Sequence, residues 1–305
     1  MVDDVEFTSY YGRPIIKAPV WKTPDVPLYL FLGGAAGTSS VLGTFADLSG
    51  RPTLTKVTRI TAGGGALASV AFLIHDLGRP ERFLHMLRVF KPTSALSVGT
   101  YILSPFSALT AATAAAELLG WFPRLRRLSG MGAAVFGGPM ATYTAVLLAN
   151  TAVPSWHAYR EKLPFVFAGS AMAAGGGIAM VFTPVEEAGP ARKMAVAGAA
   201  VELAVVSQVE NDPSIVSEPY HVGRAGKFMR AARACTGTGA ALTVLTGRTR
   251  LGAVASGTLL AAGSLLTRFG VFDAGMASAR DPKYTVIPQR ERMAARDSEA
   301  RSVIH

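Results

Sequence analysis

The sequence predicts an all-α polytopic membrane protein with about eight transmembrane helices. Of its 305 residues, 50% are hydrophobic and only 16% are charged, whereas about a quarter of the residues of a soluble domain are charged. The mean hydropathy is positive, at +0.33. A helix needs about 20 mostly apolar residues to cross the hydrocarbon core. Long runs without Asp, Glu, Lys or Arg meet that need, at 26–46, 60–74, 92–116, 128–159, 163–185, 234–247 and 251–267.

We predict eight spans from these runs. The sixth is interrupted by Glu202 and the seventh is short, so seven or nine spans are also compatible with the sequence. Small residues cluster inside several spans and let helix backbones approach closely in lipid, so we interpret them as helix contacts rather than phosphate-binding loops. The predicted spans are 26–47, 56–76, 93–120, 129–153, 162–183, 192–210, 231–247 and 251–271.

An even number of spans places both termini on one side of the membrane, which we call the terminal face. It comprises the N-terminal segment, the loops near 77–92, 154–162 and 211–230, and the C-terminal tail. Of the 30 Lys and Arg residues, 20 fall on this face and 10 on the opposite face. The positive-inside rule therefore predicts that both termini are cytoplasmic.

The basic character of the chain fits a membrane protein. Its sequence pI is about 10.0, which is typical of cytoplasmic loops in contact with anionic lipid, and we do not expect nucleic-acid binding. The first residues carry no basic segment ahead of an apolar core, so we do not expect a cleaved signal peptide.

The residues able to do chemistry gather on the terminal face. The stretch "LIHDLGRPERF" leaves the second span there, and we expect Gly78 and Pro80 to end the helix. His75 and Asp76 have two interpretations. They cap and anchor the helix end, or they pass protons to a bound electron carrier, because a histidine of pKa about 6.5 beside a carboxylate suits that role. All five histidines fall on this face, namely His75, His85, His157, His221 and His305.

Glu202 is the one ionisable residue that we expect near mid-depth in the spans. Such a residue costs about 2.5–3.5 kcal/mol to insert and is by default a functional candidate. It is interpreted either as a proton-relay residue or as one partner of an interhelix hydrogen bond. Asp47 and Glu117 are expected at solvated helix ends near the opposite face, where Glu117 is also a possible exit for protons.

Three further polar or aromatic residues lie near the terminal ends of spans. Tyr29 sits about one turn inside the first span, where it belongs to an aromatic belt or donates to a ligand carbonyl. Asn150 and Trp156 flank the end of the fourth span and have the same two interpretations: belt and turn residues, or ligand contacts.

Several redox and metal sites are excluded by what the sequence lacks. No histidine is expected mid-span, so haem is not predicted. The chain has one cysteine, Cys235, which cannot hold an iron–sulfur cluster or form an internal disulfide. No Walker A, CxxC or HExxH motif is present, and no metal site is predicted.

Four blocks in order resemble the NrfD-like family, the membrane subunits of polysulphide reductase and related molybdopterin oxidoreductases. They are "PLYLFLGGAAG", "FLIHDLGRPERFLHMLRVFKPTSALSVGTYIL", "TAVPSWH" and the tail "ASARDPKYTVIPQR". The resemblance implies two four-helix bundles without haem. It also implies a menaquinone or ubiquinone site at the face that touches an iron–sulfur subunit, which relays electrons to or from a catalytic subunit.

The resemblance places functional residues on this sequence. It implies quinone contacts at Tyr29 and Arg79 and proton transfer through Asp76 and His75. Position in the spans, rather than the resemblance, adds Asn150 and Trp156 as quinone contacts and Glu202 as a proton-transfer residue. In some family members a span-one histidine contacts the quinone, but span one here has none.

We expect a docking arm at 1–25, a transmembrane domain at 26–275 and a polar tail at 276–305.

The leading hypothesis is therefore a quinone-reactive subunit of the cell membrane. Its expected partners are a ferredoxin-like iron–sulfur subunit and a molybdopterin catalytic subunit docked on the terminal face. A cytoplasmic terminal face favours a formate-dehydrogenase-like catalytic subunit. The alternatives are a secondary transporter or proton-conducting protein without a redox role, and a structural anchor.

Overall fold

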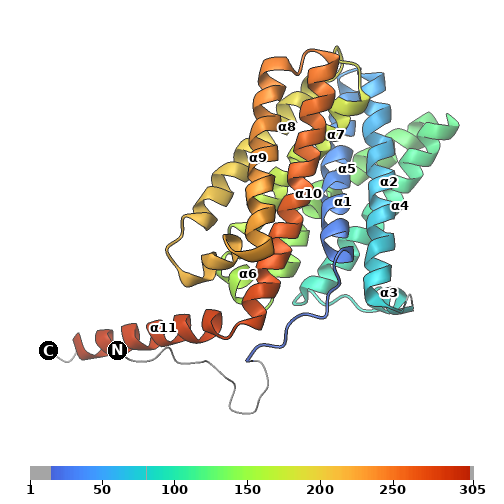
Figure 1. The fold of residues 1–305 in the computed structure, drawn as a ribbon. Helices are drawn as coiled ribbons and strands as arrows, with labels where there is room; N and C mark the ends of the chain where they lie inside the picture. The colour runs from blue at the N-terminus through green and yellow to red at the C-terminus, as the bar shows by residue number, and fades with distance from the viewer. Residues whose placement is uncertain (1–14, 80, 303–305) are drawn as a thin grey trace.

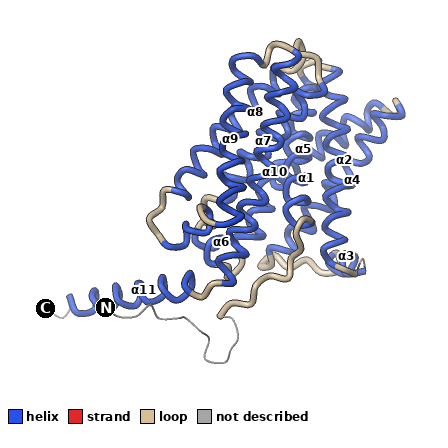
Figure 2. Tube along the Cα trace, in the orientation of Figure 1, coloured by secondary structure: helices blue, strands red, loops and turns tan. Residues whose placement is uncertain are grey.

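The structure, a computed structural model, describes residues 15–79 and 81–302, and over these residues it contains only helices and loops (Figures 1 and 2). Short helices α3 (Glu81–Met86) and α6 (Pro154–Ala158) and the 3-10 helix η1 (Ile215–Tyr220) lie in connections. The long helices are α1 (Asp25–Leu48), α2 (Pro52–Leu77), α4 (Ala95–Leu119), α5 (Pro123–Ala149), α7 (Leu163–Phe182), α8 (Gly189–Glu210), α9 (Gly223–Thr246), α10 (Arg250–Arg280) and α11 (Lys283–Ser302).

Eight of the long helices form two four-helix bundles. Helices α1, α2, α4 and α5 pack on one another as the first bundle, and α7, α8, α9 and α10 as the second. The two bundles meet mainly where α7 packs against α1 and α5. The two-bundle architecture implied by the family resemblance is therefore present.

The prediction of an all-α polytopic membrane protein is confirmed. Each predicted span corresponds to one long helix, and within the described part of the chain six helices are long and apolar enough to cross a membrane: α1, α2, α4, α5, α7 and α10. Helices α8 and α9 are long but more polar, since α9 carries four basic residues in its first half and α8 carries Glu202. The number of eight spans stays a prediction.

The sidedness expected from the sequence is visible in Figure 1, where α3, α6 and α11 all lie at the lower end of the molecule. The turns that join α1 to α2 and α7 to α8 lie at the other end. The histidines His75, His85, His157 and His221 belong to elements of the terminal face. His305 lies outside the described residues.

Glycine allows the helices of the second bundle to pack backbone against backbone. A Cβ added at Gly169 of α7 would lie 2.7 Å from the backbone nitrogen of Glu202 in α8, and one added at Gly177 would lie 2.7 Å from the carbonyl oxygen of Gly257 in α10. Neither position accepts a larger residue without separating the helices. The small-residue clusters thus act as helix contacts, as expected in lipid.

Two helices extend further than the sequence predicts. Helix α9 begins at Gly223 rather than near 231, and α10 continues to Arg280 rather than ending near 271. Arg268, which we counted among the 20 basic residues of the terminal face, is fully buried within α10 and does not belong to them. The expectation that Glu202 is the one ionisable residue deep in the bundle is wrong for this reason.

Candidate functional site

A pocket opens between the helices of the first bundle near the terminal face, and we call it the Tyr29 pocket. Residues of α1, α2, α3, α4 and α5 line it, and most of them are apolar. The volume of its cavity is about 30 Å³, which accommodates about one water molecule. Half-buried Met86 and exposed Leu96 stand at the terminal-face side of the lining. A ring-sized ligand fits only if these side chains move.

Polar groups of the pocket are few and mostly engaged. The Ser69 hydroxyl donates to the carbonyl oxygen of Tyr29 over 3.0 Å. The Tyr143 hydroxyl donates to the carbonyl oxygen of Ala95 over 2.6 Å, and its ring occupies the space that a side chain at Gly99 would need.

Two hydroxyls of the pocket are free to bind a ligand. The Tyr29 side chain is buried, and its hydroxyl has no hydrogen-bond partner among the residues that the structure describes, although it lies near enough to Tyr143 and Asp76 to interact electrostatically with both. The buried Thr144 hydroxyl likewise lacks a partner within the described residues. Both can donate to a carbonyl oxygen, which is the chemistry that orients a ligand in an otherwise apolar pocket.

A carboxylate–histidine pair stands one helical turn from Tyr29. Asp25 is the first residue of α1, and its carboxylate lies 2.7 Å from the Nδ1 atom of His75. The two side chains differ sharply in exposure, at 7% for Asp25 and 74% for His75. His75 thus contacts solvent at the terminal face, and Asp25 is the buried member of the pair. The N-terminus of α1 favours the negative charge of the Asp25 carboxylate.

The segment before α1 is fixed on the same helix end. The backbone N–H of Lys22 donates to the Asp76 carboxylate over 2.9 Å, and the Lys22 ammonium group donates to the carbonyl oxygen of His75 over 3.5 Å. Trp21 stacks on Trp156 with ring centroids 5.6 Å apart. Residues 21–25 therefore connect the Tyr29 pocket with the base of the second bundle.

Glu202 lies in a different place from the other predicted proton-transfer residues. It is buried in the second bundle, where its Oε1 atom accepts a hydrogen bond of 2.5 Å from Thr267. The nearby Arg268 donates to the carbonyl oxygen of Phe167 over 2.9 Å, and its guanidinium group lies 3.8 Å from the centre of the Phe167 ring. Neither charged residue lines the Tyr29 pocket.

The remaining predicted quinone contacts do not line the pocket either. Trp156 is fully buried, and its indole N–H donates to the carbonyl oxygen of Val271 over 2.7 Å. Asn150 is exposed at the end of α5. Arg79 is exposed in the turn after Gly78, whose left-handed conformation (φ 70°) ends α2 as predicted. Pro80, the other predicted helix stop, lies outside the described residues.

Sequence reasoning missed three residues of this site. Asp25 precedes Tyr29 by four residues, so both lie on one face of a helix, and that spacing was a usable signal. Tyr143 and Thr144 lie deep in α5 among apolar residues, where no pattern distinguishes a pocket wall from packing.

Asp47 and Glu117 are not simple solvated helix ends. Arg59 of α2 is buried and forms salt bridges with both, at 3.2 Å to Asp47 and 2.9 Å to Glu117. Arg126 and Arg127 approach the same carboxylates. We call this ion-pair cluster of the opposite face the Arg59 network.

The family described as "Polysulphide reductase, NrfD" matches residues 17–195, which is more than half of the chain. The chain belongs to the NrfD family. No curated protein matches the sequence. Members of the NrfD family are quinone-interacting membrane subunits of molybdopterin oxidoreductase complexes.

The NrfD match covers the candidate site completely. The matched range begins before Lys22, contains the whole first bundle and α7, and ends within α8. Among the described residues no group of three or more His, Cys, Asp or Glu side chains is placed to hold a metal ion.

Proposed function

We propose that this NrfD protein is the quinone-reactive subunit of its complex and exchanges electrons between a partner iron–sulfur subunit and the menaquinone or ubiquinone pool. The observation that carries the proposal is the Tyr29 pocket, an apolar cavity with two unengaged hydroxyl donors. A quinone has two carbonyl oxygens, both acceptors, and an apolar ring that suits such a pocket.

The donors of the pocket match the acceptors of a quinone. Tyr29 and Thr144 hold the carbonyl oxygens by donating their hydroxyl hydrogens. Met86 and Leu96 move aside to admit the ring, because the closed cavity of about 30 Å³ is smaller than a quinone head group. The ring enters from the lipid between helices of the first bundle, since α2 and α4 are the least buried of its four helices.

Protons reach the pocket from the terminal face. Reduction of a quinone takes up two electrons and two protons, and the reverse reaction releases them. His75 exchanges protons with water, and its Nδ1 atom passes them to or from the Asp25 carboxylate. Asp76 is a second proton-transfer residue, with one carboxylate oxygen held by the Lys22 backbone. Asp25 lies one helical turn from Tyr29 in α1, and Asp76 is near enough to Tyr29 to interact with it electrostatically.

The partner subunits dock on the terminal face. The iron–sulfur subunit brings its cluster below the pocket, and a molybdopterin subunit, of the formate-dehydrogenase kind, supplies or consumes the electrons. Arg79 is exposed beside the pocket and is available to the quinone or the partner. The protein resides in the cell membrane with both termini in the cytoplasm.

Quinone turnover by the purified complex tests the proposal. Tyr29→Phe removes one donor, and because a hydrogen bond contributes about 1–1.5 kcal/mol, we expect kcat/KM for quinone to fall about tenfold. Asp76→Asn keeps an acceptor for the Lys22 N–H and removes the titrating group, so it should lower kcat while the complex stays assembled.

Tyr101→Phe is the matched control. Tyr101 is an exposed tyrosine of α4 outside the pocket whose hydroxyl donates to the carbonyl oxygen of Leu87. Full turnover by Tyr29→Phe would contradict the proposed site. Purification of the chain without any redox subunit would instead favour the transporter hypothesis, to be tested by ion flux into vesicles.

A further inference from the structure

A groove of about 490 Å³ separates α8 from α9 near the opposite face. Each of these helices packs mainly on α7 or α10 and only lightly on the other, so the space between them opens on the outside of the second bundle. We call it the α8–α9 groove. It is independent of the Tyr29 pocket, which belongs to the first bundle.

One end of the groove is strongly basic. Arg192, Lys193 and Arg248 line it, and no acidic residue does. Arg192 donates to the carbonyl oxygens of Val185 and Gly247 over 2.9 Å and 3.4 Å, which fixes it between the two helix ends. Lys193 and Arg248 are exposed and form no hydrogen bond or ion pair within the described part of the chain.

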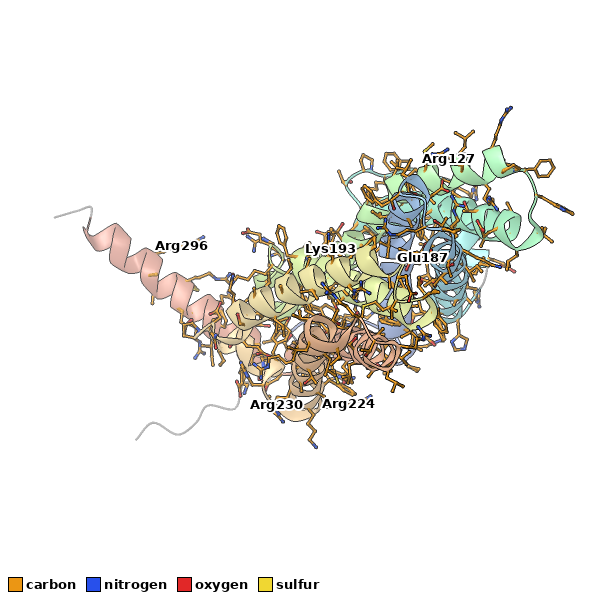
Figure 3. The ribbon with its side chains drawn as sticks, turned by 90° about the horizontal axis from the view of Figure 1, so that it is seen from above. Arg127, Glu187, Lys193, Arg224, Arg230 and Arg296 are labelled. Carbon is orange, nitrogen blue, oxygen red and sulfur yellow. The ribbon has the colours of Figure 1, made fainter. Side chains whose placement is uncertain are left out.

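The Arg59 network of the first bundle, on the same face, differs from this groove. There Arg59 and its neighbouring arginines form salt bridges with Asp47 and Glu117. The carboxylate nearest in sequence to the groove, Glu187, accepts hydrogen bonds from Thr53 and Leu54 of α2. Figure 3, which looks down on this face, shows Lys193 over the second bundle and away from Arg127. The positive charge of the groove is therefore left for an external anion.

Apart from Thr243, the rest of the groove is apolar. Val196 and Ala197 of α8 and Val244 of α9 line it, and Val244 is 69% exposed. The occupant must then be anionic at the membrane surface and apolar toward the interior. A small inorganic anion satisfies the first condition alone.

We propose that the α8–α9 groove binds an anionic phospholipid. Lys193 and Arg248 contact the phosphate group, and an acyl chain lies along Val196, Ala197 and Val244. Basic pockets between transmembrane helices bind anionic head groups on the cytoplasmic or matrix side of membranes, and the same charge complementarity holds for this groove on the opposite face. The lipid fills the space where α8 and α9 do not pack closely and so completes the outer wall of the second bundle.

Native mass spectrometry of the detergent-purified protein, with its bound subunits, tests this site. Phosphatidylglycerol and phosphatidylcholine with identical acyl chains are titrated separately. Wild type should retain at least one phosphatidylglycerol molecule more than phosphatidylcholine. Lys193→Gln combined with Arg248→Gln should weaken that binding roughly 10- to 30-fold, since each basic residue near the surface contributes about a factor of five.

Two matched variants make the result specific. Lys56→Gln with Arg124→Gln removes the same charge from exposed positions of the first bundle on the same face and should leave the lipid bound. Ala197→Phe fills the groove without changing charge and should also displace the lipid. Both should elute as wild type in size-exclusion chromatography.

Several outcomes would overturn the proposal. Equal retention of phosphatidylcholine would show that charge is not recognised, and equal loss in the Lys56 and Arg124 control would show general surface attraction. Displacement of the lipid by inorganic phosphate would identify a small-anion site. A dimer that dissociates in the groove variants would show that a second copy of the chain occupies it.

Discussion

The two bundles of this NrfD protein bury polar groups in different ways. In the first bundle, polar residues lie at both ends, and the apolar pocket between them holds two unengaged hydroxyls, of Tyr29 and Thr144. In the second bundle, Glu202 and Arg268 are enclosed by closely packed helices, and neither lines any pocket described above. The Tyr29 pocket has space beside its free donors for a ligand to enter, whereas Glu202 and Arg268 are packed against neighbouring helices. We infer that the first bundle reacts and the second supports it.

Direct contacts between α1, α7 and α10 join the two bundles. The Thr38 hydroxyl of α1 donates to the carbonyl oxygen of Ala171 in α7 over 2.8 Å. A Cβ added at Gly34 would lie 3.4 Å from the guanidinium of Arg268, so this arginine reaches from α10 to the first bundle. These contacts link the second bundle to α1, the helix that carries Tyr29.

The largest effect is expected from Arg268→Ala. Removing one member of a buried charged set costs about 3–5 kcal/mol, because Glu202 is left buried without a nearby cation. The free energy of unfolding in mixed detergent micelles should fall by that amount. Arg280→Ala, an exposed arginine at the end of the same helix, should change it by less than about 0.5 kcal/mol. Equal losses would contradict the structural role assigned to Arg268.

Glu202→Gln separates support from proton transfer. The amide side chain of this variant still accepts a hydrogen bond from Thr267 but carries no charge, so a supporting role predicts altered stability with normal quinone turnover. The sequence hypothesis of a proton-transfer role predicts the reverse, lost turnover in a stable complex. Turnover and unfolding measured on one preparation decide between them.

Arg59→Gln should have an intermediate effect, in the first bundle. It leaves Asp47 and Glu117 without their buried partner, and we expect a loss of about 2 kcal/mol because water reaches the network in part. Arg127→Gln removes a largely exposed member of the same network and should cost less than about 1 kcal/mol. A larger loss for Arg127 would mean that exposure does not govern these ion pairs.

Much of the fold follows directly from the sequence, since uncharged runs and the Gly78 stop depend on local chemistry. The start of α9 and the end of α10 do not follow from the local sequence in this way. Arg224, Lys227 and Arg230 resemble a loop, yet they extend α9 into the terminal face. Arg268 falls inside the predicted span 251–271, but its burial does not follow from the local sequence, because its partners Phe167 and Glu202 belong to helices far away in sequence.

The candidate site was predictable to a similar extent. Tyr29, His75 and Asp76 lie at the same end of the first bundle, which is what the first span and the "DLGRP" block predict. Whether the Trp156 indole N–H faces a ligand or a carbonyl oxygen depends on the packing of α6 against α10, which the sequence does not encode locally.

The smallest effect is expected at the link between the bundles on the opposite face. Glu187, in the loop between α7 and α8, caps α2 by accepting from the backbone N–H groups of Thr53 and Leu54 at 2.8 Å and 3.0 Å and from the Thr53 hydroxyl at 2.8 Å. Desolvation acts to raise the pKa of Glu187, but the hydrogen bonds from Leu54 and Thr53 outweigh it, so its pKa lies below the ordinary value.

A carboxylate with a lowered folded-state pKa stabilises the protein above its unfolded pKa and loses that contribution as the pH falls through the folded value. Glu187→Gln should therefore cost about 1 kcal/mol at pH 7, and the difference from wild type should shrink below the ordinary glutamate pKa. Glu186→Gln, an exposed neighbour, should change nothing at either pH. A difference that persists in acid would show that the amide, rather than the missing charge, disturbs the junction. The contact of Glu187 with α2 would then depend on the geometry of the side chain and not on its charge.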